Sequence, residues 1–186
     1  EKTLFDTRKV FLMLAVGIVF GMVVTFLDAS ISKPPDLLII LLFAIGFAVF
    51  EEMFKFVVLN LKRLQLRFDT VFCGFSLGVG LSSTFVLSHV YFSIILYSSV
   101  AASVWISLVV FSVVLSLDHG STGNLIGWGS AKGRPWYFFG EAMTIRLFFI
   151  MVLVPMIGDI GEEWMKIISL AVALLLSILI YHYYIT

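Results

Sequence analysis

The chain has 186 residues, of which 61% are hydrophobic and only 13% are charged. Soluble domains carry about a quarter charged residues, so this composition excludes an ordinary soluble fold. The formal net charge is zero, which predicts no nucleic-acid partner. The single cysteine, Cys73, excludes an intrachain disulfide and a thiolate metal cluster.

Apolar segments of roughly 20 residues recur along the chain, and a helix of that length crosses the ~30 Å hydrocarbon core of a lipid bilayer. Backbone polar groups in lipid must be paired internally, and the sequence lacks the ~10-residue alternation of barrel strands. We therefore predict an all-α, polytopic transmembrane bundle of six or seven spans, a single integral-membrane domain over residues 1–186. The clearest spans are 10–27, 37–61, 70–92, 101–117, 136–157 and 164–184, and the polar, glycine-rich segment 118–135 is expected to connect the fourth to the fifth.

The basic residues are distributed unequally between the two sides of a six-span bundle. Two fall on one side, Lys33 and Lys166. Eight fall on the other side: Lys2, Arg8, Lys9, Lys62, Arg63, Arg67, Lys132 and Arg134. Because cytoplasmic segments carry an excess of lysine and arginine, this distribution predicts a multi-pass protein with both termini in the cytoplasm.

The second span contains the segment FEEMFKF, residues 50–56. Glu51 is the fifteenth residue of that span, which places it roughly 20 Å from the start of the helix at ~1.5 Å per residue. A charge at that depth costs at least ~2.5 kcal/mol, so intramembrane carboxylates usually mark a functional site. Glu51 or Glu52 can act as a base, and Lys55 lies one turn after Glu51 and offsets part of the charge. The alternative is a structural ion-pair cluster that ties helices together.

A second copy of the same spacing serves as an internal comparison. Glu162, Glu163 and Lys166 lie in EEWMK, at the start of the sixth span. A charged cluster costs little at the membrane surface. This copy is therefore predicted to anchor the helix at the interface rather than to form a site.

Further polar residues interrupt the later spans. His89 ends FVLSH, with Phe85 one turn earlier on the same helix face. His119 lies in DHGSTGN, close to Asn124, and Arg146 lies deep in the fifth span, where it is positioned to pair with Glu51 or Glu52. Two histidines together with a carboxylate pair favour a site. Gly74 and Gly78 in the third span instead have the spacing of helix packing.

These motifs resemble, in order, those of the CAAX-protease and bacteriocin-processing superfamily of intramembrane proteases. The superfamily also includes the PrsW proteases and the APH-1 subunit of gamma-secretase. EEMFK (51–55) and the glycine-rich segment 68–85 are most similar to PrsW, whereas FVLSH (85–89) is similar to the CAAX-protease branch. That branch has asparagine four residues after its last histidine, but here Asn124 is five residues after His119. The resemblance covers a protease-like core at about residues 37–130.

The resemblance implies an enzyme that hydrolyses a peptide bond of a membrane-embedded or lipidated substrate. By similarity, Glu51 or Glu52 is the general base to a water, His89 holds and polarises that water, and His119 with Asn124 steadies the oxyanion. Lys55, Phe85 and Arg146 are expected to support them. No cofactor is expected, and the alternative is zinc held by Glu51, Glu52, His89 and His119.

The predicted boundaries create a geometric difficulty. Straight helices put Glu51 near mid-membrane, His89 toward the outer side and His119 at the cytoplasmic end, so the three side chains would not meet. A bend within residues 74–83, or a fourth span shifted later so that 118–129 enters the membrane, would bring them together.

Two other functions are compatible with the same residues. One is a non-catalytic scaffold, the role of APH-1 in gamma-secretase. The other is a proton or ion transporter, because membrane glutamates and histidines also form relays. Against transport, the sequence has no convincing inverted repeat and no pair of broken helices.

Overall fold

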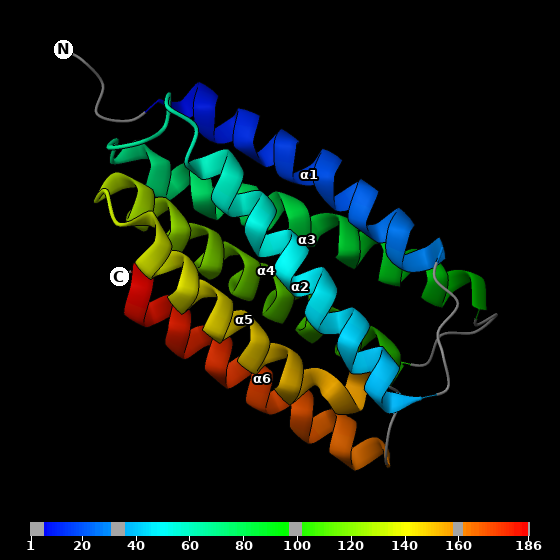
Figure 1. Ribbon diagram of the computed structural model, residues 1–186. Coiled ribbons are helices and arrows are strands. Elements are labelled where there is room, and N and C mark those ends of the chain that lie inside the picture. The colour runs from blue at the N-terminus through cyan, green and yellow to red at the C-terminus, as the bar shows by residue number, and fades with distance from the viewer. Residues whose placement is uncertain (1–5, 31–35, 97–101, 158–161, 186) are drawn as a thin grey trace.

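The computed structural model describes residues 6–30, 36–96, 102–157 and 162–185 and consists of helices joined by short connections (Figure 1). Within those ranges there is no strand, and six helices are long and apolar enough to cross a membrane. They are α1 (Thr7–Ser30), α2 (Leu37–Leu59), α3 (Asp69–Leu96), α4 (Ala102–Ala131), α5 (Pro135–Ile157) and α6 (Glu163–Ile185). The predicted all-α bundle of six membrane spans is confirmed. Lys2, Lys33 and Ala101, the predicted first residue of the fourth span, lie outside the described residues.

Several connections between helices lie at one end of the bundle, which we call the connector end. The backbone N–H of Leu66, between α2 and α3, donates to the carbonyl oxygen of Ser130 in the last turn of α4 at 3.2 Å. The start of α1 lies at the same end, because Lys9 Nζ is 3.6 Å from Asp69 Oδ2. The last turn of α6 is also there (Figure 1). The basic residues of several connections therefore lie at one end, as the six-span count requires.

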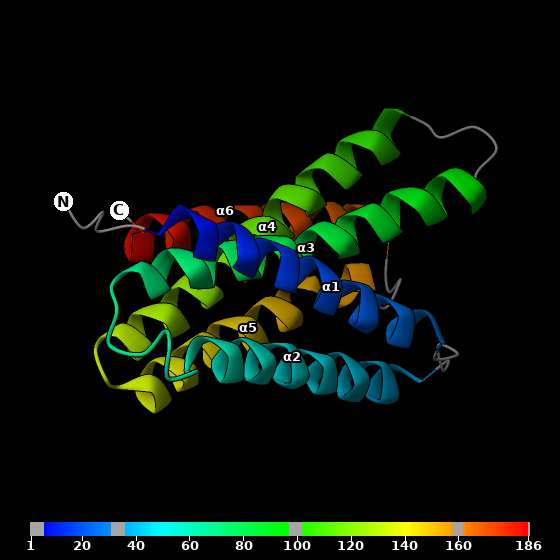
Figure 2. The ribbon, with the colours of Figure 1, turned by 90° about the horizontal axis from the view of Figure 1, so that it is seen from above.

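The helices are not arranged in sequence order. α3 lies between α1 and α4, and α2 lies on the other side of the bundle, beside α5 (Figures 1 and 2). An added Cβ at Gly78 of α3 would overlap the carbonyl oxygen of His119, and one at Gly74 would overlap that of Gly123. The two glycines therefore let α3 and α4 approach closely, the packing role that their spacing predicts.

The prediction that the fourth span ends at residue 117 and is followed by a polar connection is wrong, and the alternative, in which the fourth span includes 118–129, agrees with the structure. α4 continues to Ala131 without interruption, and every residue from 118 to 127 is buried. A helix enclosed by other helices does not need an apolar surface, because its polar side chains bind neighbouring helices instead of lipid. The extension also moves His119 from the expected end of the helix into the interior of the bundle.

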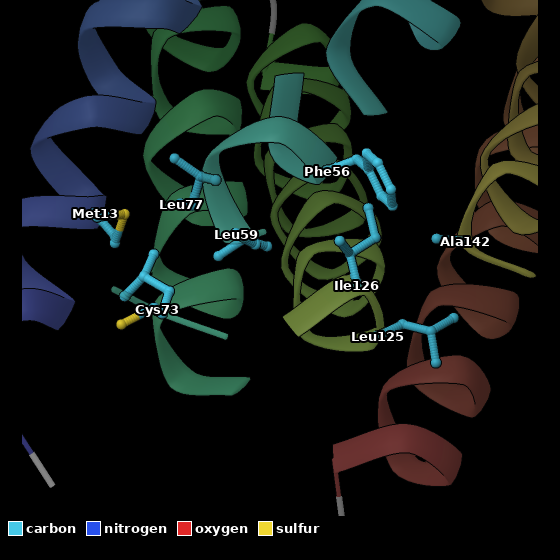
Figure 3. Packing of buried hydrophobic residues seen from close by; sticks show 9 residues of the cluster. Met13, Phe56, Leu59, Cys73, Leu77, Leu125, Ile126 and Ala142 are labelled. Atoms are coloured by element: carbon cyan, nitrogen blue, oxygen red, sulfur yellow. The ribbon is translucent and has the colours of Figure 1, made fainter. Parts of the chain in front are cut away.

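Two apolar clusters surround the middle of the bundle. The first joins five helices toward the connector end and contains Met13, Phe56, Leu59, Leu64, Cys73, Leu77, Leu125, Ile126 and Ala142 (Figure 3). The second joins α4, α5 and α6 toward the opposite end and contains Phe111, Val114, Leu115, Phe149, Leu153, Leu170 and Ala173. Along α5, Arg146 lies between Ala142 of the first cluster and Phe149 of the second. A polar layer is therefore enclosed between two apolar layers.

Candidate active site

Buried polar side chains from three helices meet in this layer, and we call them the polar cluster. Its members are Glu51, Glu52 and Lys55 of α2, Asp118, His119 and Thr122 of α4, and Arg146 of α5. Counted over the whole residue, none of them is more than 8% exposed. Ionisable side chains are almost never buried in this way unless they are paired, so the pairing inside the cluster determines what it can do.

Helix periodicity brings these side chains to one face of each helix. On α2, the buried residues are Ala48, Glu51, Glu52, Lys55, Phe56 and Leu59, which follow the i, i+3, i+4, i+7 pattern of a single face. The intervening Phe50, Met53 and Val57 are exposed. On α4, Asp118 and Thr122 are four residues apart and share a face in the same way.

The polar cluster lies deep in the bundle. Glu51 is eight residues before the end of α2, and Arg146 is eleven residues after the start of α5. At ~1.5 Å per residue these positions are roughly 12 Å and 16 Å from the connector end. Both residues therefore lie well inside their helices and not at the helix ends, as predicted for Glu51.

One half of the cluster connects α2 to α4 through Lys55. Its Nζ is 2.6 Å from Glu52 Oε1 and 2.8 Å from Thr122 Oγ1. The Thr122 hydroxyl is also 3.1 Å from Glu52 Oε1. Lys55, Glu52 and Thr122 are all 0% exposed. This half contains one ammonium group and one carboxylate, which pair with each other, so its net charge is zero.

The other half connects α2, α4 and α5 through Arg146. Arg146 Nη2 donates to Glu51 Oε2 at 2.8 Å, and Nη1 donates to Asp118 Oδ2. The prediction that Arg146 pairs with one of the two glutamates is confirmed for Glu51. A guanidinium can bind two carboxylates at once because its N–H groups form a fixed fork.

His119 lies beside this second half. Its Nε2 is 3.9 Å from Glu51 Oε2, which is longer than a direct hydrogen bond. Phe85 of α3 stacks on the imidazole with ring centroids 6.1 Å apart and an interplanar angle of 14°. Phe85 therefore supports His119 by packing, while Glu51 faces the polar edge of the ring.

Several polar atoms of the cluster are buried and have no hydrogen-bond partner among the described residues. They are Glu52 Oε2, Asp118 Oδ1, His119 Nδ1 and Nε2, and Arg146 Nε. Buried polar atoms are normally paired with protein or with ordered water. These donors and acceptors are the kind that a small polar molecule such as water binds.

The structure brings five of the predicted site residues into the cluster, namely Glu51, Glu52, Lys55, His119 and Arg146, with Phe85 packed against it. It does not bring in His89 or Asn124. His89 is exposed, its Nδ1 is 2.9 Å from the carbonyl oxygen of Phe85, and its ring packs against Phe111. Asn124 Nδ2 donates to the carbonyl oxygen of Tyr184 at 3.1 Å and thereby fastens α4 to α6.

Sequence reasoning missed two members of the cluster, Asp118 and Thr122. Hydropathy places both in a polar connection, because the apolar run of the fourth span ends at residue 117. Asp118, Thr122 and Leu125 have i, i+4, i+7 spacing, and this helical period was the available signal.

The EEWMK copy lies outside the polar cluster, as predicted. Glu163 begins α6, its side chain is 85% exposed, and its Oε1 is 3.0 Å from Lys166 Nζ. The same pattern of two glutamates and a lysine therefore forms a surface ion pair in α6 and part of a buried cluster in α2.

The zinc alternative does not fit these side chains. Among the described residues, no group of three or more histidine, cysteine or acidic side chains is arranged to hold a metal ion. The carboxylates that would bind zinc already bind Arg146 and Lys55, and His89 is outside the cluster.

No family model, curated protein or solved structure matches this chain. The resemblance to intramembrane proteases therefore rests on the motifs of the sequence, and what it implies is a proposal.

Proposed function

We propose that this chain is an intramembrane endopeptidase that hydrolyses a peptide bond with a water activated by Glu51. The observation that carries the proposal is the approach of Glu51 Oε2 to His119 Nε2, 3.9 Å apart and buried at mid-depth. A water that lies to one side of the line joining these two atoms, about 2.8 Å from each, hydrogen-bonds to both. They come from positions 68 residues apart in the sequence, and both belong to motifs that resemble those of the protease superfamily.

The proposed chemistry assigns one role to each group. The Glu51 carboxylate takes a proton from the water while the water oxygen attacks the carbonyl carbon of the substrate. His119 holds the water as a hydrogen-bond partner. Arg146, whose Nε has no partner among the described residues, is a fixed cation beside the oxygen that becomes negative, and such preorganised charge lowers the barrier.

The geometry favours Glu51 over Glu52 as the base. Glu52 Oε1 accepts from both Lys55 and Thr122, and the residue is 0% exposed. The Glu51 side chain is 3% exposed and that of Arg146 is 10% exposed. The Glu51–Arg146 pair is therefore the part of the cluster that comes nearest to the surface of the bundle.

The proposal includes the superfamily and the setting. The chain would belong to the CAAX-protease, bacteriocin-processing and PrsW group and act on a membrane-embedded or lipidated protein or peptide. The connector end, which carries the basic residues, would face the cytoplasm. Both termini would then be cytoplasmic.

The test is cleavage of transmembrane peptides by the purified protein in bilayers. Glu51→Gln and His119→Ala should each lower the rate by at least ~10²-fold, the scale expected for loss of a general base or its partner. Glu163→Gln is the matched control, because it removes an exposed copy of the same glutamate, and it should cleave like the unmodified protein. Cleavage that survives both cluster substitutions would refute the proposed site.

Two other outcomes would favour other functions. Folded protein that cleaves none of the peptides favours the scaffold. Proton flux into liposomes that is lost in Glu51→Gln favours transport. One feature of the structure supports this second function. The cluster contains three carboxyl groups but only two fixed cations, Lys55 and Arg146, which leaves one carboxyl group able to gain and lose a proton, as a relay requires.

A further inference from the structure

The excess of acidic groups lies in one half of the polar cluster. Glu52 and Lys55 form one pair, with Nζ 2.6 Å from Oε1, and their charges cancel. Glu51 and Asp118 instead share the single guanidinium of Arg146. If both were ionised, this half would carry one uncompensated negative charge between two apolar layers.

We propose that Glu51 and Asp118 hold one proton between them, so that one is a carboxylate and the other a carboxylic acid. An uncompensated buried charge is strongly unfavourable, and the exposed fractions of Glu51 and Asp118, 2% and 1%, leave little room for solvent to offset it. Two carboxyl groups that share one site cannot readily ionise together. Retention of one proton makes the Glu51–Arg146–Asp118 unit neutral.

His119 is the other group that could take this proton, but its surroundings oppose a charge on the ring. An imidazolium has two N–H donors, and neither His119 Nδ1 nor Nε2 has a hydrogen-bond partner among the described residues. The ring is 0% exposed and stacked on Phe85. Lys55 and Arg146 also place two positive charges in the same cluster. A neutral imidazole fits these neighbours better than a charged one.

The shared proton has a use in the reaction, which rests on the proposed function. Glu51 as the carboxylate accepts a proton from water, and the water oxygen forms a bond to the carbonyl carbon. Asp118 as the acid gives its proton to the departing amine nitrogen as the carbon–nitrogen bond breaks. The pair begins and ends with one proton, and only its position changes from Asp118 to Glu51. Transfer back to Asp118 restores the starting state.

Infrared spectroscopy of the purified protein in bilayers tests the proposal without a substrate. A protonated carboxyl group has a stretching band separate from those of carboxylates, and we expect the intensity of one such group per molecule at neutral pH. Labelling all aspartates or all glutamates with carbon-13 should move the band and identify which residue type carries the proton. This measurement uses the unmodified chain, so it does not depend on a variant that folds.

Variants assign the band to the pair. Asp118→Asn and Glu51→Gln each leave one carboxylate opposite Arg146, so each should remove the band. Glu163→Gln, at an exposed site, should leave it unchanged. No protonated carboxyl band in the unmodified protein, or a band that persists in both cluster variants, would overturn the inference. Peptide cleavage without the band refutes only the shared proton, whereas the band without cleavage refutes only the proposed protease function.

Discussion

Arg146 Nη2 on α5 lies 2.8 Å from Glu51 Oε2 on α2, a contact between residues 95 positions apart in the sequence. The same guanidinium binds Asp118 on α4. Three helices therefore meet at one side chain, in a layer enclosed by apolar residues. Removal of one partner alone from this ion pair would leave a buried charge unpaired, which is strongly unfavourable.

Arg146→Gln should lower the free energy of unfolding by about 3–5 kcal/mol, since it leaves the buried carboxyl groups of Glu51 and Asp118 without the cation that they share. Denaturation in mixed micelles, followed by circular dichroism, measures the change. Arg134→Gln is the control, because Arg134 is exposed in the connection before α5, and surface substitutions usually stay within ~0.5 kcal/mol. Adding Asp118→Asn to Arg146→Gln should recover part of the loss. Equal stability of the two arginine variants would contradict the role of Arg146.

The Glu52–Lys55 pair should be replaceable by apolar side chains. Replacing a buried ion pair with residues of similar volume is often neutral for stability, whereas removing one partner costs about 3–5 kcal/mol. We expect Glu52→Leu alone and Lys55→Met alone to unfold at lower denaturant concentration than the unmodified protein. The double variant should unfold close to it and retain peptide cleavage. A double variant that folds but does not cleave would show that Glu52 takes part in the reaction.

His89 and His119 should differ sharply when substituted. His89→Ala removes an exposed ring that packs on Phe111, so its cleavage rate should stay within about threefold of the unmodified protein, on the scale of a surface substitution. His119→Ala removes the group facing Glu51 and should lower the rate by at least ~10²-fold. The measurement is the rate at which each variant cleaves the same transmembrane peptide. A large loss in His89→Ala would restore the water-polarising role that the motif resemblance implies.

Chelators should leave cleavage unchanged. The carboxylates of the cluster bind Arg146 and Lys55, and the described residues contain no other set of ligands suited to zinc. Cleavage assays with and without a strong chelator, combined with elemental analysis of the purified protein, measure this. Loss of activity that zinc alone restores would contradict the arrangement of the cluster.

The fold could be predicted from the sequence because its pattern of long apolar segments is strong. Six apolar runs of sufficient length have few alternatives in a membrane, and the position of Glu51 well inside the second helix follows from counting residues. The pairing of Arg146 with a glutamate was predictable for a similar reason, since an isolated cation deep in a span requires an anion.

The end of α4 was not predictable from apolarity. Residues 118–131 are rich in glycine and polar side chains, which hydropathy treats as a connection. They are helical because Asp118 and Thr122 have partners on α5 and α2, which hydropathy cannot detect. His89 was predicted as a site residue but lies outside the polar cluster. A motif gives the type of residue, but it does not give the distance along α3 at which the helices meet.

The close approach of α3 and α4 at Gly78 leads to the last prediction. A methyl group there would overlap the backbone carbonyl oxygen of His119, and a backbone atom cannot move aside as a flexible side chain does. We expect Gly78→Ala to separate the two helices, to cost about 1–3 kcal/mol, and to lower cleavage by moving His119 relative to Glu51. Gly46→Ala in α2 is the matched control, since nothing lies within 4 Å of its added Cβ, and alanine in a helix interior should stabilise it by about 0.5–1 kcal/mol. Unfolding in mixed micelles and cleavage rates measure both effects. If Gly78→Ala were as stable and as active as Gly46→Ala, α3 and α4 could not approach each other as closely as the structure shows.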